Sequence, residues 1–370
     1  MRQETSPDGQ NARWHFRRLM KTKFANPILC LTLLLAALSA CLLVAGPAAA
    51  ESAPGYGVVR TMLLGGDGGW DYIFVDSGAR RAYIARATRF MVVDLESGKL
   101  AGEISDTLGA HGVALVPALG VGFTSNGRED TSSVFDLKTL KVSEKIKTAE
   151  GPDAIVYDAA SGNVFTMNGR GKNASVIDPK TRKVVATIPL SGKPETPVPD
   201  GNGRMYINIE DKNTIAVVDT KANKVVTEWP LAGCDEPSGL DMDHDDGTLF
   251  VACGNKVMVI VDSKTGKLIA TIPTGDGSDG LAYDPKAKIA VTSNGEGNMT
   301  FVGKRDGKYV LLENVPTKKG ARTIGFDATT SQFLTVSADF GPAQKPSPDN
   351  PRGRPAPLPN SFEVIVVGKK

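Results

Sequence analysis

The chain has 370 residues, of which 41% are hydrophobic and 23% are charged, and its formal net charge is +2 at pH 7. Residues 1–50 carry six Lys or Arg and two Asp or Glu, a balance of +4, so the rest of the chain carries about −2. Bulk charge therefore gives no support for nucleic-acid binding, which is usually marked by an excess of Lys and Arg.

The first 50 residues have the features of an export signal. Two lysines precede an apolar run, Ile28–Val44, and Ala48 and Ala50 form an A-x-A cleavage site. We therefore expect residues 1–50 to be a signal peptide that is cleaved before Glu51. The mature chain would then have no transmembrane segment and would reside in the periplasm or outside the cell.

Two alternatives to a cleaved signal stay open. The apolar run could be retained as a membrane anchor, although it is short for a span. The segment Leu38–Cys41 resembles a bacterial lipobox, which would place a lipid on Cys41.

The mature chain begins with a strand that has no blade of its own. Val58–Gly65 resembles Val184–Ser191, the last strand of a later repeat, yet no repeat precedes it. At the other end, Phe362–Val367 reads as the third strand of a repeat whose fourth strand is missing. We expect Val58–Leu64 to supply that fourth strand, which removes the free edges of the sheet.

A unit of about 42 residues recurs between these two ends. Each copy has an apolar run that ends in Asp, a turn that ends in Lys and a second β-branched run, as in Ala174–Ile188. The turn-opening residues are 42, 42, 41, 43 and 41 positions apart: Asp94, Asp136, Asp178, Asp219, Asp262 and Gly303. A period near 42 in short β-rich units is typical of a β-propeller in which each repeat is one blade.

A second landmark marks the first strand of each blade. The seven segments are Trp70–Asp76, His111–Pro117, Asp153–Asp158, Thr196–Asp200, Ser238–Asp243, Asp279–Asp284 and Arg322–Asp327. Two prolines weaken the prediction for the fourth segment. The sequence thus predicts an all-β fold over residues 51–370, a seven-bladed β-propeller of four-stranded blades whose ring is closed by the N-terminal strand.

The hairpin turns follow a chemical rule with two exceptions. Asp caps the backbone N–H groups two residues on, and Gly or Asn tolerates the left-handed conformation of a tight turn. Leu140 and Arg182 stand at that position in two repeats, so we expect those two hairpins to turn differently.

The seventh repeat carries a Pro-rich insertion at residues 341–360. Its composition predicts an extended, solvated loop. A tolerated insertion and a lid or recognition arm are both open interpretations.

Several second strands share a signature. Phe123–Asn126, Phe165–Asn168 and Val291–Asn294 read FTSN, FTMN and VTSN. Together with the V-[IV]-D-x-x-[TS]-G-K turn, they resemble the YVTN-repeat (YncE-like) β-propeller family over about residues 57–370. The resemblance implies the propeller fold, whereas the roles of family members are too diverse to imply a function.

The starts of the first strands are the candidate ligand-binding positions. In a propeller these starts surround one mouth of the central channel. The predicted ring is Asp71, His111, Asp153, Glu195, Ser238, Asp279 and Arg322. Its carboxylates could bind a cationic ligand or a divalent cation, with Asp153, Glu195 and Asp279 as metal candidates, or they could cap local N–H groups. The loops between second and third strands, including Arg86–Arg89, are expected on the same face.

Cys234 and Cys253 fall in one repeat, where antiparallel pairing would bring them together. An oxidising compartment permits a disulfide, and two buried thiols are the alternative.

Catalytic patterns are scarce. There is no G-x-S-x-G, the mature chain has only His111 and His244, and no paired His or Cys spacing predicts zinc or haem. We predict no catalytic residue and no cofactor beyond a possible divalent cation.

The sequence therefore favours an exported, monomeric, non-enzymatic binding or scaffold propeller. It would engage a protein, peptide or cell-envelope component on its channel-mouth face. The alternative is a metal-dependent, lactonase-like hydrolase that uses the mouth carboxylates. Nucleic-acid binding by the Lys-rich hairpins is the least favoured hypothesis.

Overall fold

The computed structural model describes residues 55–346, 353 and 355–370. The predicted signal peptide therefore lies outside the described residues. Within this part of the chain, two single-turn 3-10 helices, η1 (Pro117–Leu119) and η2 (Glu210–Lys212), are the only helical elements. No helix in these ranges has the length and apolar character needed to cross a bilayer.

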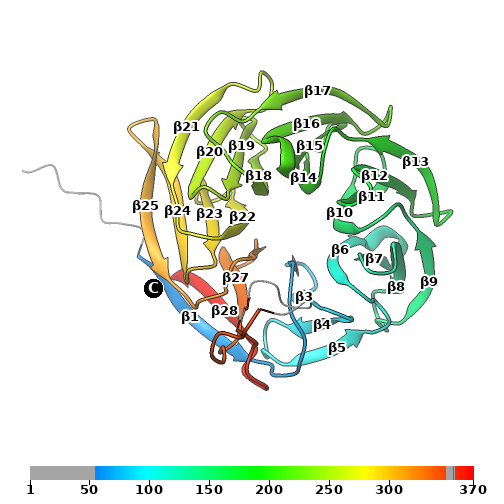
Figure 1. Cartoon of the computed structure of the whole chain (residues 1–370), viewed down its shortest axis with the longest axis horizontal. Coiled ribbons are helices and arrows are strands. Elements are labelled where there is room, and N and C mark those ends of the chain that lie inside the picture. Colours follow the sequence, from blue (N-terminus) through cyan, green and yellow to red (C-terminus); the bar gives the residue numbers. More distant parts are fainter. Residues whose placement is uncertain (1–54, 347–352, 354) are drawn as a thin grey trace, which may run out of the picture. The chain divides into compact units, whose positions relative to one another are not determined.

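The strands form seven four-stranded antiparallel sheets arranged in a ring (Figure 1). Blade 1 contains β2 (Ile73–Asp76), β3 (Arg81–Arg86), β4 (Arg89–Asp94) and β5 (Leu100–Ile104). Blade 2 contains β6 (Ala110–Val116), β7 (Val121–Asn126), β8 (Thr131–Asp136) and β9 (Val142–Lys147). Blade 3 contains β10 (Pro152–Asp158), β11 (Asn163–Asn168), β12 (Asn173–Asp178) and β13 (Lys183–Pro189). Blade 4 contains β14 (Pro194–Pro199), β15 (Arg204–Ile209), β16 (Thr214–Asp219) and β17 (Lys224–Pro230).

Blade 5 contains β18 (Pro237–Asp243), β19 (Thr248–Cys253), β20 (Val257–Asp262) and β21 (Leu268–Pro273). Blade 6 contains β22 (Ser278–Asp284), β23 (Ile289–Asn294), β24 (Asn298–Arg305) and β25 (Lys308–Pro316). Blade 7 contains β26 (Gly325–Asp327), β27 (Gln332–Ser337), β28 (Glu363–Lys369) and β1 (Tyr56–Leu63). The first strand in each list is the innermost in the ring, as the labels β6, β10, β14, β18 and β22 show (Figure 1).

Ring closure by the N-terminal strand is confirmed. β1 pairs antiparallel with β28, from Tyr56 opposite Lys369 to Leu63 opposite Glu363, with a bulge at Val59. The blue and red strands lie side by side in Figure 1. β1 therefore fills the fourth position of blade 7, so β28 is paired on both sides like the third strand of every other blade.

The core is shared between neighbouring blades. Ile84 and Val93 of blade 1 pack in one buried cluster with Leu334 and Val364 of blade 7. The two middle strands of a blade are buried on both faces, which explains their nearly continuous apolar runs. Each blade therefore depends on its neighbours for burial, as in other repeat proteins.

The fourth blade forms its first strand despite its prolines. β14 pairs with β15 through Pro194 opposite Ile209 and Pro197 opposite Ile207. An innermost strand is an edge strand, so a proline that lacks an N–H on the channel side breaks no ladder bond.

The prediction for the Leu140 and Arg182 hairpins was wrong. Both residues adopt the left-handed conformation, with φ of 60° and 56°, close to the 72° of Gly98. Their amides donate to the carbonyls of Asp136 and Asp178 at 2.8 Å, as in the glycine-containing turns. The Asp cap and this bond hold the turn although a left-handed residue other than Gly costs about 1–2 kcal/mol.

The last residue of each second strand occupies an equivalent, fully buried position. Three blades place Asn there: Asn126, Asn168 and Asn294. Each Asn side chain donates to two polar side chains of the third strand, for example from Asn126 to Thr131 at 3.0 Å and to Ser133 at 2.8 Å. The signature Asn therefore joins the second and third strands at the mouth end of the blade.

Other blades fill this position with a different connection. Blade 1 has Arg86, the first residue of the predicted mouth-face segment Arg86–Arg89, which ends β3 and is 1% exposed. In blade 7, the Ser337 hydroxyl donates to the carbonyl of Lys319 at 2.6 Å. Blade 5 has Cys253, which forms a disulfide with Cys234. These three residues connect the second strand to the loop that precedes the first strand.

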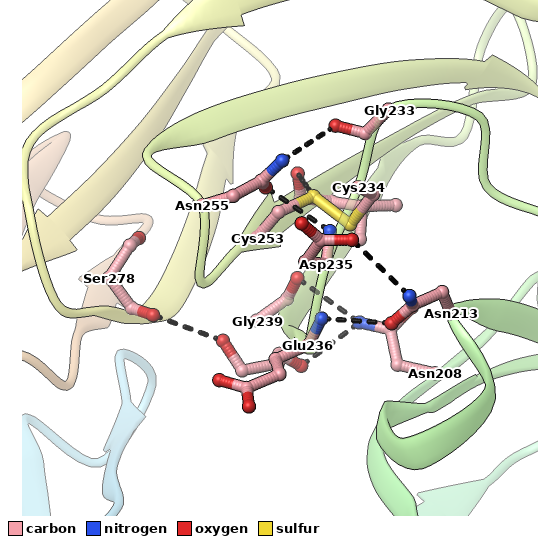
Figure 2. Close-up of a disulfide and its surroundings, with 12 residues drawn as sticks. Asn208, Asn213, Gly233, Cys234, Asp235, Glu236, Gly239, Cys253, Asn255 and Ser278 are labelled. Carbon is pink, nitrogen blue, oxygen red and sulfur yellow. Dashed lines mark hydrogen bonds between the residues drawn. A yellow bond between two sulfur atoms is a disulfide. The ribbon is translucent and has the colours of Figure 1, made fainter.

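The disulfide joins the end of β19 to the loop before β18 (Figure 2). Both cysteines are buried, and their Cα atoms are 5.4 Å apart. Asn255 supports the same loop, since its side chain donates to the carbonyl of Gly233 at 3.0 Å and accepts from the amide of Asp235 at 3.1 Å.

Removing this disulfide should destabilise the protein substantially. The bond spans 19 residues, and a loop of that size is expected to contribute about 3 kcal/mol. The Cys234→Ala/Cys253→Ala variant should lose this amount in guanidinium-induced unfolding. Reductant should lower the free energy of unfolding of the wild type to a similar level and leave that of the variant unchanged. Equal stability of the two proteins without reductant would contradict this role.

The Pro-rich insertion at residues 341–360 has backbone pairing at its two ends that the sequence did not predict. Phe340 and Pro357 form a β-bridge, and the amide of Gly341 donates to the carbonyl of Ala356 at 2.9 Å. The two ends of the insertion therefore run antiparallel as a hairpin-like arm. Residues 342–346 and 356–360 are nevertheless exposed, as the prediction of an extended, solvated loop requires.

Candidate functional site

The predicted ring residues lie where the innermost strands begin. Five of them lie in β-bulges, where the first strand has an extra residue relative to the second: His111, Asp153, Glu195, Ser238 and Asp279. Asp71 and Arg322 lie just before β2 and β26. A bulge releases a residue from the ladder and redirects its side chain, which suits a binding position.

The structure brings Asp71, His111 and Asp153 together from three neighbouring blades. The Nδ1 atom of His111 is hydrogen-bonded to Oδ2 of Asp71. Oδ1 of Asp153 is 3.5 Å from the same nitrogen. The three side chains are only 32%, 22% and 24% exposed for His111, Asp71 and Asp153, so they form one partly buried group.

Two further pairs complete the mouth. Nζ of Lys193 is 2.7 Å from Oε1 of Glu195 and also contacts Glu210 in η2. Nη1 of Arg322 is 3.1 Å from Oδ2 of Asp279. Glu195 and Asp279 therefore each have a cationic partner from the chain itself.

Ser238 does not join this group. Its side chain is buried, and its hydroxyl donates to the carbonyl of Ser278 in the next blade at 3.2 Å. Its own carbonyl accepts from the Asn208 side chain at 3.0 Å. The residue connects blades 4, 5 and 6, and this use of its polar atoms leaves it no ligand-binding geometry.

Burial shifts the pKa values of the side chains at the mouth. Burial first, and then the charge of Asp71, raise the pKa of Asp153 to about 6, although His111 opposes the shift. Burial and the charge of Asp153 raise the pKa of Glu195 to about 8 against the effect of Lys193. Burial also raises the pKa of Asp279. Burial alone would lower the pKa of His111, but its bond to Asp71 and the nearby charges raise it.

Tyr72 lies among these carboxylates. Burial, followed by the charges of Asp153, Glu195, Asp71 and Asp279, raises its pKa well above the usual value. Tyr72 also packs against the core cluster that contains Ala154. It lines a cavity of about 290 Å³ formed by the innermost strands of blades 1 to 4. The cavity wall therefore includes a phenol that directly follows the mouth residue Asp71 in sequence.

The arm of the insertion begins close to this mouth. The ring of Trp70, the neighbour of Asp71 in sequence, lies 5.9 Å from that of Phe340 and 5.3 Å from that of Phe362. These contacts anchor both ends of the Pro-rich segment beside blade 1.

Sequence reasoning missed Tyr72, Lys193 and Glu210. Tyr72 directly follows a predicted ring residue, and Lys193 stands two residues before Glu195. Their closeness in sequence to ring residues could therefore have indicated that they lie at the mouth. Glu210 gave no signal, because a one-turn helix after β15 brings it to the mouth.

The group best arranged for a metal differs from the predicted one. In residues 55–346, 353 and 355–370, the one close set of three His, Cys, Asp or Glu ligand atoms belongs to Asp71, His111 and Asp153, and these atoms lie within 4.8 Å of one another. Asp153 is shared with the predicted set, whereas Glu195 and Asp279 are occupied by Lys193 and Arg322.

Comparisons with known proteins give the fold and no family. No family model matches the sequence, and no curated protein matches it. A chain of the hydrazine synthase of Kuenenia stuttgartiensis superposes with a TM-score of 0.62 at 18% identity, and the match covers 71% of this chain and 91% of that chain. At this identity the similarity shows the fold alone.

Proposed function

We propose that the protein is an exported binding propeller that takes a cationic group of a protein, peptide or cell-envelope component at its channel mouth. The observation that carries this proposal is the charge balance there. Asp71, Asp153, Glu195 and Asp279 converge with Glu210 on a mouth whose cations are Lys193, Arg322 and the His111 imidazole.

A ligand can reach these acids. The side chains of Asp71, Asp153 and Asp279 are 22%, 24% and 33% exposed, so each presents part of its carboxylate to solvent. Burial of the remainder strengthens the attraction for a cation, because partial desolvation lowers the effective dielectric constant. Loops and insertions beside such a rigid scaffold commonly contribute to binding.

Export and family membership belong to the same proposal. The signal-like residues 1–50 and the buried disulfide both fit an oxidising compartment outside the cytoplasm. The repeated Asn at the ends of β7, β11 and β23, with its shared hydrogen-bonding role, supports placement in the YVTN-repeat propeller family.

A fluorescent hexa-arginine peptide tests the binding proposal. We expect the wild type to bind it, and the variant Asp153→Asn/Glu195→Gln/Asp279→Asn to bind at least about tenfold more weakly, a difference of ~1.4 kcal/mol. The matched control removes three exposed acids from hairpins on the opposite face: Glu96→Gln/Asp245→Asn/Asp306→Asn. Fluorescence anisotropy at 150 mM salt measures the peptide affinity of the wild type and of the two variants. Equal losses in the two variants, or no binding by the wild type, would contradict the proposal.

A metal-dependent hydrolase is the second candidate. The observation that favours it is the group formed by Asp71, His111 and Asp153, which combines imidazole and carboxylate ligands. A divalent ion held there would supply Lewis-acid chemistry for an ester or lactone. Screening lactones and esters with and without added Zn²⁺ tests this candidate, and hydrolysis lost in Asp153→Asn is the result expected of it.

A further inference from the structure

We propose that Asp71, His111 and Asp153 form a binding site for a divalent first-row transition-metal ion of the Zn²⁺ class. This inference rests on the proposed function, because it specifies a metal ion as one cation that the mouth takes. It assigns the ion to the sector of the mouth between blades 1, 2 and 3, away from the partnered acids Glu195 and Asp279.

The first argument is an excess of acceptors at one nitrogen. Nδ1 of His111 can donate one hydrogen bond, and Asp71 receives it. Asp153 nevertheless places Oδ1 3.5 Å from the same nitrogen. Ligand atoms bound to zinc at about 2.0–2.2 Å in a tetrahedron lie roughly 3.4 Å apart, which resembles the spacing of His111 and Asp153. Asp71, which is hydrogen-bonded to the same nitrogen, would move away from it to become the third ligand. A single ion in place of the proton would satisfy all three groups at once.

The second argument is charge. In the described part of the chain, no Lys or Arg forms an ion pair with Asp71 or Asp153, and His111 is their one ion-pair partner. By contrast, Lys193 and Arg322 pair with the other two mouth acids. Two partly buried carboxylates against one imidazole leave negative charge that a divalent ion would compensate.

The third argument is a rigid backbone below the ligands. The Ser125 side chain accepts from the amide of Gly112 at 2.8 Å and donates to the carbonyl of Asp153. The Thr323 hydroxyl donates to the carbonyl of Asp71 at 3.1 Å. One bond within blade 2 and two bonds between neighbouring blades thus hold the segments that carry the three ligands, and such preorganisation favours a metal site.

Gly127 makes room for the imidazole. A Cβ atom at this position would lie 2.7 Å from Nε2 of His111, closer than atoms in contact allow. The φ angle of Gly127 is not in the left-handed region, so Ala would act by displacing the ring and by contacting the Pro152 carbonyl, which would lie 3.0 Å from its Cβ atom.

The donor set indicates the kind of ion. One imidazole nitrogen and two carboxylate oxygens suit Zn²⁺ and similar ions, and three protein ligands leave a fourth position for water. Ca²⁺ takes six to eight oxygen ligands, more than this sector offers.

Titration calorimetry of the chelator-treated mature protein with Zn²⁺ tests the proposal. We expect one ion per chain, and at least about tenfold weaker binding by His111→Gln, Asp153→Asn and Gly127→Ala. His244→Gln is the matched control, since His244 is the other mature-chain histidine and lies exposed in the hairpin between β18 and β19. Circular dichroism and thermal melting establish that each variant is folded. Millimolar Ca²⁺ should leave Zn²⁺ binding unchanged.

Three results would overturn the assignment: no Zn²⁺ binding by the wild type, binding retained in both folded ligand variants, or displacement of Zn²⁺ by Ca²⁺. The hexa-arginine assay repeated in chelator separates this inference from the proposed function. Peptide binding without Zn²⁺ binding overturns the metal site alone. Zn²⁺ binding without peptide binding overturns the proposed partner and leaves the metal site standing.

Discussion

Deleting residues 56–63 should remove about 5 kcal/mol or more from the free energy of unfolding, a loss comparable with the whole stability of many domains. The deletion takes away β1 and leaves the ladder edge of β28 unpaired. It also removes Tyr56 and Met62, which are 4% exposed, and the stacking of Tyr56 on Phe301 at 4.3 Å. Full burial of each such side chain is worth roughly 2–3 kcal/mol.

Rescue in trans makes this experiment specific. A synthetic peptide of residues 55–64 should restore part of the lost melting temperature of the deleted protein, because it can pair with β28. A scrambled peptide of the same composition is the control. A deletion variant that melts like the wild type, or equal rescue by both peptides, would show that closure by β1 does not stabilise the ring.

Replacing Arg86 should destabilise the protein far more than replacing its partly exposed neighbour Arg89. Its guanidinium donates to the carbonyls of Asp67 at 2.7 Å and Gly68 at 3.1 Å, and it lies 3.6 Å from the centre of the Phe362 ring. Burial lowers its pKa to about 10, which reflects how little water surrounds it. Arg86→Ala removes these bonds, the contact with Phe362 and a large side chain that is 1% exposed, so we expect a loss of about 4 kcal/mol in urea-induced unfolding.

A neighbour on the same hairpin is the control for Arg86. Arg89 forms an ion pair with Glu103 at 2.9 Å, and their side chains are 20% and 35% exposed. Such a pair contributes under about 1 kcal/mol, so Arg89→Met should have a small effect. Arg86→Lys should recover only part of the loss, since an ammonium group lacks the planar fork that reaches several carbonyls. Similar losses for Arg86→Ala and Arg89→Met would contradict the proposed difference.

The fold could be predicted from the sequence because its information is local and repeated. Most blades carry their own Asp-capped hairpin and β-branched runs. A wrong assignment of strands in one repeat is therefore corrected by comparison with the other repeats. The two ends of the repeat series were equally informative. The last repeat lacks a fourth strand and the N-terminal segment is a strand without a blade, which together predicted ring closure. The hairpins at Leu140 and Arg182 were mispredicted because residue preference is weaker than the hydrogen bonds that define the turn.

The candidate site could be predicted only in outline. The repeat frame located Asp71, His111 and Asp153 at the mouth, but it gave no distances between blades. Bulges in β6 and β10 orient two of these side chains, and no residue pattern announces a bulge. The same limit applies to Arg86, because the sequence did not show that this charged residue at the end of β3 is buried against a loop that precedes it by about 20 residues.

Because β1 pairs with β28, the seventh blade can form only when both of these strands are present. During synthesis or export from the N-terminus, β1 emerges first and its partner last, so the six internal blades can assemble while β1 waits. A chain truncated anywhere before Glu363 keeps β1 without its partner and exposes an unpaired edge at each end of the blade series. Such edges are targets for proteases and for aggregation. The topology therefore makes completion of the seventh blade depend on strands from both ends of residues 55–370.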